Sequence, residues 1–190
     1  MNKKISYLVS IVIAVGLIIL IKPYVEQTKE KSKYSFSVES VDGTLTLNSF
    51  KGKVLAVYFG YTFCPDVCPT SLSRLAHALN QLDKQKVKDN FAGLFISVDP
   101  NRDKLKDLAS YSKYFHENFK GATSNKKNID DIVKRYGTYY KKVELENSSM
   151  GYSVAHTSYI YFFDKKGNFV KKVDHFSNPK EIKEVLKSLL

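Results

Sequence analysis

The chain is poor in cysteine and in arginine. Its 190 residues include only two cysteines, too few for the disulfide framework that stabilises small secreted proteins. Among 30 basic residues only Arg74, Arg102 and Arg135 are arginine, and the lysines are spread along the chain. Proteins that recognise nucleic acid gather basic residues on one face and use arginine to contact bases and phosphates. The formal net charge of +11 therefore does not indicate a nucleic-acid partner, and we expect none.

Apolar runs of membrane-spanning length are also scarce, and the one example lies near the N-terminus. Residues 5–21 are 17 consecutive residues without a charge, between Lys4 and Lys22, which is the lower limit for crossing the hydrocarbon core of a bilayer. A cleaved signal peptide is the competing interpretation, but its apolar region is shorter and ends in small residues. The sequence after Gly16 has no pair of small residues at which a signal peptide could be cleaved, and no cysteine lies nearby for a lipoprotein anchor. We therefore expect residues 1–22 to be an uncleaved transmembrane signal anchor.

The rest of the chain is predicted to be one domain without internal repeats. Residues 23–35 are polar and indicate a tether, whereas residues 36–190 have the patterns of a folded domain. Apolar runs and the alternation of apolar with polar residues predict strands at 44–47, 53–61, 91–98, 158–164 and 168–173. Apolar residues at helical intervals predict helices at 69–82, 103–118, 128–136 and 181–190. Alternating strands and helices that end in a hairpin predict an α/β sandwich with a mixed central sheet.

The two cysteines, Cys64 and Cys68, are separated by three residues and follow the strand predicted at 53–61. Each is followed by a proline, which is well tolerated at the first position of a helix. We therefore predict that Cys68 caps a helix that starts at Pro69. The partial positive charge of a helix N-terminus favours thiolates, which act as nucleophiles in disulfide exchange and as metal ligands. Two inert, buried cysteines are the alternative, which the prolines and Asp66 in this loop disfavour.

Two thiolates make an incomplete metal site, and a third ligand would come from the four histidines. His77 lies off the apolar stripe of its predicted helix, His116 has no evident partner, and His175 lies in a loop after the strand predicted at 168–173. His156 lies in the loop just before the strand predicted at 158–164. If that strand lies beside the first buried strand, this loop approaches the cysteines. Spacing alone favours an inert histidine over a metal ligand at each of the four positions.

Acidic residues occupy two loops of interest. Asp66, between the cysteines, is predicted to be a turn residue whose carboxylate accepts backbone N–H groups. The alternative is that Asp66 tunes the thiolates or contacts a partner protein. The segment from Asp99 to Asp103 is predicted to be a structural turn in which Asp103 caps the following helix.

Three segments carry a resemblance to a known family. They are GYTFCPDVCP at 60–69, SVDPNRD at 97–103 and SVAHTSYIYFFDKKGNF at 153–169. In order and spacing they resemble the Sco/SenC family of copper proteins, which are membrane-tethered assembly factors of cytochrome c oxidase. The resemblance extends over residues 36–190 and implies a thioredoxin-like sandwich, in which helices flank a mixed central sheet.

The resemblance implies that Cys64, Cys68 and His156 are the ligands of one copper ion. Soft thiolates and an imidazole suit copper as Cu(I) or Cu(II). Structural zinc usually has four protein ligands, and this chain has no further cysteine to complete such a site. Phe63 and Ala155 depart from the family pattern, since many members have His and Asp there. Neither position holds a primary ligand, so the departures concern the surroundings of the site.

The expected function is that of a metallochaperone that delivers copper to cytochrome c oxidase, with the copper-site subunit of the oxidase and a copper donor protein as partners. The alternative is a thiol–disulfide oxidoreductase that reduces the cysteines of that oxidase site. The spacing of the redox-active pair permits a disulfide, but efficient exchange enzymes generally use Cys-x-x-Cys. A peroxiredoxin-like peroxidase is disfavoured, because Cys64 lacks the threonine that such enzymes place three residues earlier.

The chemistry also predicts a compartment. A cysteine pair that cycles between dithiol and disulfide does not suit the cytosol, where thiols are kept reduced. Lysines flank residues 5–21 on both sides, so their charges leave the orientation open. From the chemistry and the resemblance we expect the N-terminus in the cytoplasm and residues 36–190 on the periplasmic or extracytoplasmic face of the inner membrane.

Overall fold

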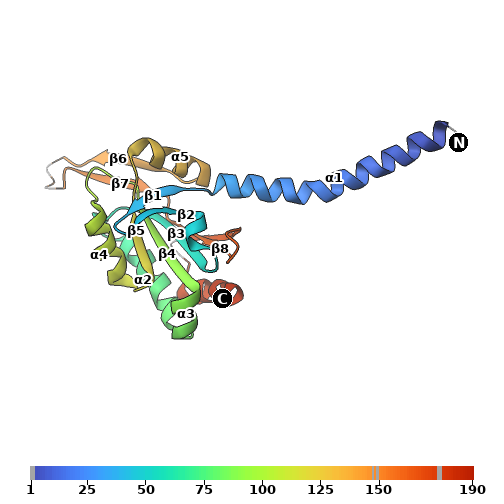
Figure 1. Ribbon diagram of the computed structural model, residues 1–190. Helices are drawn as coiled ribbons and strands as arrows, with labels where there is room; N and C mark the ends of the chain where they lie inside the picture. Colours follow the sequence, from blue (N-terminus) through green and yellow to red (C-terminus); the bar gives the residue numbers. More distant parts are fainter. Residues whose placement is uncertain (1–2, 147, 149, 175–176) are drawn as a thin grey trace.

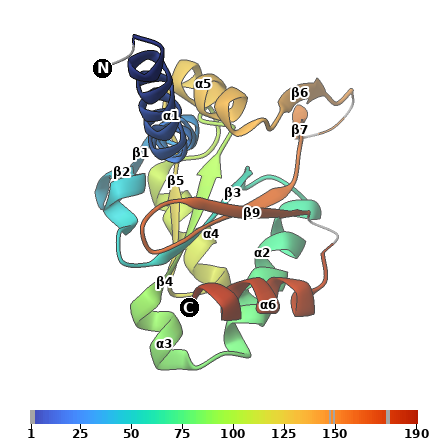
Figure 2. The ribbon, with the colours of Figure 1, turned by 90° about the vertical axis from the view of Figure 1, so that its right-hand side faces the viewer.

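A five-stranded mixed sheet lies at the centre of the computed structural model, which describes residues 3–146, 148, 150–174 and 177–190. The strand order is β5-β4-β3-β8-β9 (Figures 1 and 2). β3, β4 and β5 are parallel, while β8 pairs antiparallel with both β3 and β9. The mixed sheet predicted from the sequence is confirmed. The strands are β3 (Val54–Gly60), β4 (Phe91–Ser97), β5 (Phe119–Ala122), β8 (Tyr159–Phe163) and β9 (Phe169–Asp174).

The two central strands are buried along their whole length, which explains their near-continuous apolar sequences. Every residue of β3 and β4 is buried. Parallel strands are joined by helical crossovers, which cover the faces of the sheet. Here α2 (Val67–Asn80) and α3 (Lys84–Asn90) connect β3 to β4, and α4 (Leu105–Phe115) connects β4 to β5. α2 contacts both α4 and α6 (Pro179–Leu189), whereas α5 (Lys126–Tyr136) packs on the opposite face.

The face covered by α5 holds a cluster of aromatic rings. The ring centroid of Tyr136 in α5 lies 5.0 Å from that of Phe59 in β3 and 5.2 Å from that of Tyr161 in β8, in edge-to-face contact. Tyr34 is buried in the same cluster, 5.0 Å from Tyr136. Each such pair contributes about 0.5–1.5 kcal/mol beyond the burial of its area. The ring of Tyr34 thus packs with the aromatic side chains on this face of the sheet.

A single helix, α1 (Lys3–Lys33), covers most of the predicted anchor and of the predicted tether, with Pro23 inside it. It extends away from the sheet (Figure 1). Its C-terminal end is held by Arg135, whose Nη1 donates to the carbonyl oxygen of Lys33 at 2.9 Å. Among the described residues, no helix combines the length and the apolar character needed to cross a membrane. The anchor at 1–22 and the tether at 23–35 stay predictions.

The sequence patterns miss several short elements, because none of them has a long apolar run or a full helical stripe. The helix predicted over 103–118 is too long, because α4 ends at Phe115 and β5 begins at Phe119. The other predicted strands and helices are confirmed to within a few residues. β2 (Gly43–Thr46) matches the strand predicted at 44–47. The missed elements are β1 (Ser37–Ser40), the 3₁₀ helix η1 (Leu47–Phe50), α3, β5, and the hairpin of β6 (Tyr140–Glu144) and β7 (Tyr152–His156).

Candidate metal centre

The segment after β3 carries both cysteines. Cys64 lies in the loop between β3 and α2, and Cys68 lies in the first turn of α2. The prediction that Cys68 caps the helix is wrong, because α2 begins earlier and Asp66 precedes it as the cap residue. Pro69 is still tolerated, because backbone N–H groups in the first turn have no partner within a helix. The backbone N–H of Cys68 donates to the Sγ atom of Cys64 at 3.4 Å.

His156 is the last residue of β7, and the prediction that it lies in a loop is wrong. β8 pairs with β3, as the sequence argument requires, so the end of β7 lies beside the cysteine loop. The Nε2 atom of His156 is 3.2 Å from the Sγ atom of Cys68. One imidazole nitrogen and the two sulfur atoms all lie within 4.8 Å of one another. The structure thus brings Cys64, Cys68 and His156 together.

Contacts on the far side of the His156 imidazole fix its orientation. Nδ1 lies 3.2 Å from the carbonyl oxygen of Thr157. A carbonyl oxygen only accepts, so Nδ1 carries the proton in this contact and Nε2 keeps its lone pair toward Cys68. The rings of Tyr58 and Tyr61 meet the imidazole edge to face, with centroids 6.2 and 6.0 Å away. Histidine binds a metal ion through a ring nitrogen that carries no proton, and a hydrogen bond at the other nitrogen orients the ring.

The two sulfur atoms differ in their protonation. A hydrogen bond from the Cys68 thiol, aided by the backbone N–H groups of Cys68 and Asp66, lowers the pKa of Cys64 to about 3. Burial and the neighbouring Cys64 raise the pKa of Cys68 well above its ordinary value. At neutral pH the pair therefore holds one proton, with Cys64 as the thiolate. A metal ion that binds both sulfur atoms must displace the proton of Cys68.

Gly60, at the end of β3, allows the sulfur of Cys68 to approach the sheet. A Cβ atom at Gly60 would lie 2.7 Å from the Sγ atom of Cys68 and 2.8 Å from the ring of Phe95. The sequence does not reveal this role of Gly60, nor the position of Tyr58 and Tyr61 beside the imidazole. All three residues belong to an apolar run, in which a neighbour of the site has the same signal as an ordinary core residue.

The other histidines are not part of this group. His77, on the exposed side of α2, lies 2.7 Å from the side-chain amide of Gln81. His116 is half-buried, and its Nδ1 atom accepts from the backbone N–H of Asn118 at 3.1 Å. His175 lies outside the described residues. Of the histidines that the structure describes, only His156 joins the cysteines.

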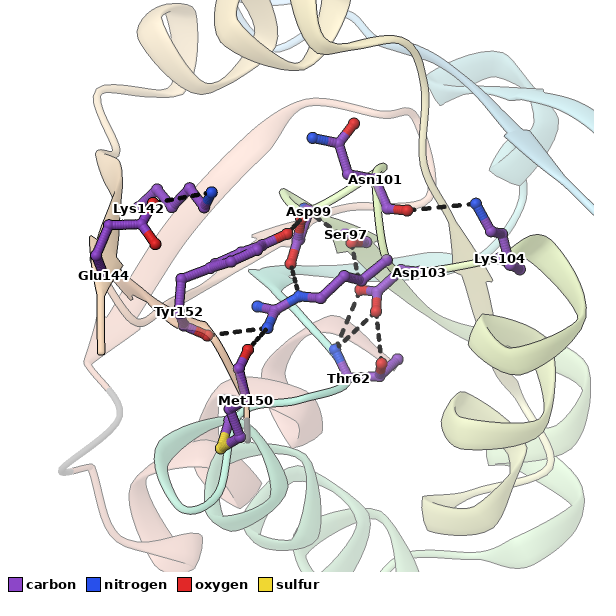
Figure 3. Close-up of polar contacts among 11 residues, drawn as sticks. Thr62, Ser97, Asp99, Asn101, Asp103, Lys104, Lys142, Glu144, Met150 and Tyr152 are labelled. Atoms are coloured by element: carbon purple, nitrogen blue, oxygen red, sulfur yellow. Dashed lines mark hydrogen bonds and ion pairs between the residues drawn. The ribbon is translucent and has the colours of Figure 1, made fainter. Parts of the chain in front are cut away.

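Two acidic residues differ from their predicted roles. The carboxylate of Asp66 accepts from the hydroxyl of Thr70 at 3.2 Å, and no side-chain bond to the backbone caps α2. Asp103 does not cap α4, because Lys104 takes that position. The carboxylate of Asp103 accepts instead from the backbone N–H of Thr62 at 3.1 Å and from its hydroxyl (Figure 3). Asp103 therefore ties the loop after β4 to the segment that carries the cysteines.

Two sulfur atoms and one imidazole nitrogen form a set of three soft or borderline donors. Such a set suits copper, whereas structural zinc usually takes four protein ligands. Within the described part of the chain, the cluster contains these three groups. Three protein donors leave a metal ion open to a ligand from another molecule. The same two sulfur atoms belong to free thiols, so the pair also has the chemistry for reversible disulfide formation.

Known proteins are similar to this chain over most of its length. A sequence model of the SCO1/SenC family matches residues 25–190. The SCO2-like protein of Rickettsia conorii is 31% identical over 198 residues, which cover 97% of this chain and 96% of that protein. The solved structure of ScoI from Arabidopsis thaliana, with copper bound, is 33% identical with a TM-score of 0.73 and covers 81% of this chain and 94% of that chain.

A second copper-bound structure, ScoI from Bradyrhizobium japonicum, is 33% identical with a TM-score of 0.68 and covers 82% of this chain and 98% of that chain. These structures support a thioredoxin-like α/β fold, as the sequence resemblance implies. They also hold copper, and this chain has a Cys–Cys–His group that can hold a metal ion. From the family match and the identity with relatives along nearly the whole sequence, the chain belongs to the SCO1/SenC family.

Proposed function

We propose that this protein is a copper metallochaperone that binds one copper ion through Cys64, Cys68 and His156. The observation that carries the proposal is the convergence of two sulfur atoms and an imidazole nitrogen within 4.8 Å. Copper-bound structures of relatives at 33% identity support copper as the metal. Membership of the family supports a role in the assembly of cytochrome c oxidase. The recipient is then the copper-site subunit of the oxidase, and a donor protein supplies the ion.

The burial of the three ligands suits a metal ion that is passed on. Cys68 is fully buried, whereas Cys64 and His156 are half-buried. Next to Cys64, the side chain of Phe63 is 48% exposed. A ligand from a partner protein can therefore approach the ion from the side of Cys64. Copper leaves by exchange of ligands, in which the partner's donors replace those of this chain one at a time and the oxidation state of the ion is unchanged.

A second candidate function is reduction of the disulfide in the oxidase copper site. The observation that favours it is the unequal pair, a half-buried Cys64 thiolate beside a buried Cys68 thiol. The thiolate attacks one sulfur of the target disulfide, and Cys68 then resolves the mixed disulfide. Two electrons and one proton pass to the target, which takes a second proton from water, and Cys64 and Cys68 become a disulfide. The spacing of three residues, in place of the usual two, argues against this function.

Copper transfer distinguishes the two candidates. The copper-loaded protein is mixed with the copper-binding domain of the oxidase subunit, whose cysteines are reduced beforehand in one sample and joined in a disulfide in the other. We expect the bound copper to move to the reduced domain, as measured by metal analysis after the proteins are separated. Reduction of the oxidised domain, without copper transfer to the reduced domain, would establish the second candidate and refute the first.

We further propose that residues 1–22 anchor the protein in the inner membrane and that 23–35 tether the domain on the extracytoplasmic side. The support is the uncharged apolar run at 5–21 and a cysteine pair suited to an oxidising compartment. Alkaline phosphatase, which requires disulfides, is expected to be active when fused after Leu190 in a bacterial host. A well-expressed but inactive fusion would contradict this orientation.

A further inference from the structure

His156 reaches the candidate metal centre from a hairpin that is separate from the central sheet. Among the described strands, β6 and β7 pair with each other and form a sheet of their own. Four of the five residues of β6 are exposed. A two-stranded hairpin is marginally stable by itself, so other contacts must hold it where His156 meets the cysteines. Such contacts come from the loop at 99–103, which follows β4.

Arg102, in this loop, contacts both the backbone and a side chain of the hairpin. Its Nη1 atom donates to the carbonyl oxygen of Tyr152 at 2.9 Å and to that of Met150 at 3.3 Å. The guanidinium carbon lies 3.6 Å from the centre of the Tyr152 ring. The Tyr152 hydroxyl donates to Oδ1 of Asp99 at 2.9 Å, and Oδ2 accepts from Nε of Arg102 at 2.5 Å (Figure 3). Each of these three side chains thus contacts the other two.

The position of Tyr152 determines how His156 is presented. The two residues are four apart on β7, and residues at even spacing on a strand point to the same face. Asp99 is 5% exposed and the side chain of Arg102 is 16% exposed, so solvent screens their ion pair little. A contact that fixes Tyr152 therefore also fixes the face of the hairpin on which the imidazole lies.

The same loop is attached to the cysteine half of the site. Asp103 accepts from the backbone N–H of Thr62, two residues before Cys64. The guanidinium of Arg102 also lies 4.8 Å from the centre of the Phe63 ring, next to Cys64. The loop at 99–103 thus contacts both the segment that carries the cysteines and the strand that carries the histidine.

We propose that Arg102 is a positioning residue that fixes His156 beside the two cysteines before copper arrives, an inference that rests on the proposed copper site. With the hairpin held in place, copper binding does not have to order the third ligand, and the affinity is higher for that reason. Lysine cannot replace Arg102. An ammonium group has no planar fork with which to bond Asp99 and the hairpin carbonyls while stacking on Tyr152.

A double-mutant cycle on Cu(II) affinity tests this role. Arg102→Lys is expected to weaken Cu(II) binding about 10–100-fold, the loss that follows removal of groups that orient a metal ligand. In a His156→Ala background the same substitution should change the Cu(II) affinity by no more than about twofold. The effects of two independent substitutions add to within about that margin. Arg135→Lys is the matched control, because Arg135 also donates to backbone carbonyls but at the end of α1. It should leave the affinity unchanged.

Amide hydrogen exchange tests the role of Arg102 in the copper-free protein. Exchange in β7 is expected to be faster in Arg102→Lys than in the wild type, while exchange in β3 and β4 stays slow. Unchanged exchange in β7, or an equal loss of affinity with and without His156, would overturn the positioning role. If His156→Ala binds Cu(II) as tightly as the wild type, the ligand assignment fails, and hydrogen exchange alone then decides the role of Arg102.

Discussion

Cys64→Ser and Cys68→Ser are each expected to lower the copper affinity of the protein by about a hundredfold or more. Groups that merely orient a metal ligand account for about 10–100-fold, and these thiolates are the proposed ligands themselves. A serine hydroxyl has nearly the same shape, but it is a hard donor, and Cu(I) prefers soft thiolate. Titration of each variant against a coloured Cu(I) chelator measures the loss.

The two serine variants differ in their expected stability, which supplies a control. Cys68 is fully buried, so Cys68→Ser leaves a hydroxyl in the core and should lower the free energy of unfolding by about 1–3 kcal/mol. Cys64 is half-buried and its pKa is lowered to about 3, so Cys64→Ser loses the stabilisation that the thiolate gives the fold at neutral pH, and this loss fades as the pH falls toward 3. Similar losses of copper affinity at unequal stability would tie the losses to the sulfur atoms. A folded variant with wild-type affinity would contradict the assignment of that cysteine.

Gly60→Ala is expected to weaken copper binding about tenfold or more and to destabilise the fold. A Cβ atom at Gly60 would meet the Sγ atom of Cys68 at 2.7 Å, so alanine displaces a proposed ligand from its position beside His156. The loss corresponds to that seen when the orientation of a metal ligand is disturbed. Overpacking of a core typically costs about 1–3 kcal/mol in the free energy of unfolding. Copper titration and chemical denaturation measure the two effects.

Gly121→Ala separates the effect on copper from the effect on stability. A Cβ atom at Gly121 would lie 2.2 Å from the backbone oxygen of Leu108, at the contact between β5 and α4. A backbone atom cannot rotate away, so we expect a cost of about 3 kcal/mol, the upper end of the usual range for overpacking. The folded fraction of Gly121→Ala should bind copper like the wild type. Equal losses in the two alanine variants would mean that copper affinity follows stability and not the position of Cys68.

The buried half of the fold can be predicted because complete burial leaves a clear pattern. β3 and β4 are buried on both faces, and their residues form uninterrupted apolar runs. The hairpin of β6 and β7 has no such pattern, because β6 is mostly exposed and carries polar residues at successive positions. The sequence therefore predicts a loop at His156, although this residue ends a strand that Arg102 contacts.

The candidate site can be predicted only in part. The cysteine pair is evident from its spacing and its prolines, but His156 is 88 residues from Cys68, and only the family resemblance indicates that the two meet. Asp103 has the position of a helix cap in the sequence, yet its carboxylate bonds Thr62 across a loop. The role of Arg102 depends on Asp99 in its own loop and on the distant hairpin, and no local pattern reports such contacts.

The central claim is that Cys64, Cys68 and His156 bind one copper ion together. The absorption spectrum of the Cu(II)-loaded protein, recorded with and without His156, tests it most directly. We predict a sulfur-to-copper charge-transfer band in the wild type that is lost in His156→Ala, with weaker Cu(II) binding. In His77→Ala, which alters an exposed histidine on α2, the band and the affinity should stay as in the wild type. An unchanged spectrum in His156→Ala, or loss of the band in His77→Ala or His175→Ala, would contradict the claim.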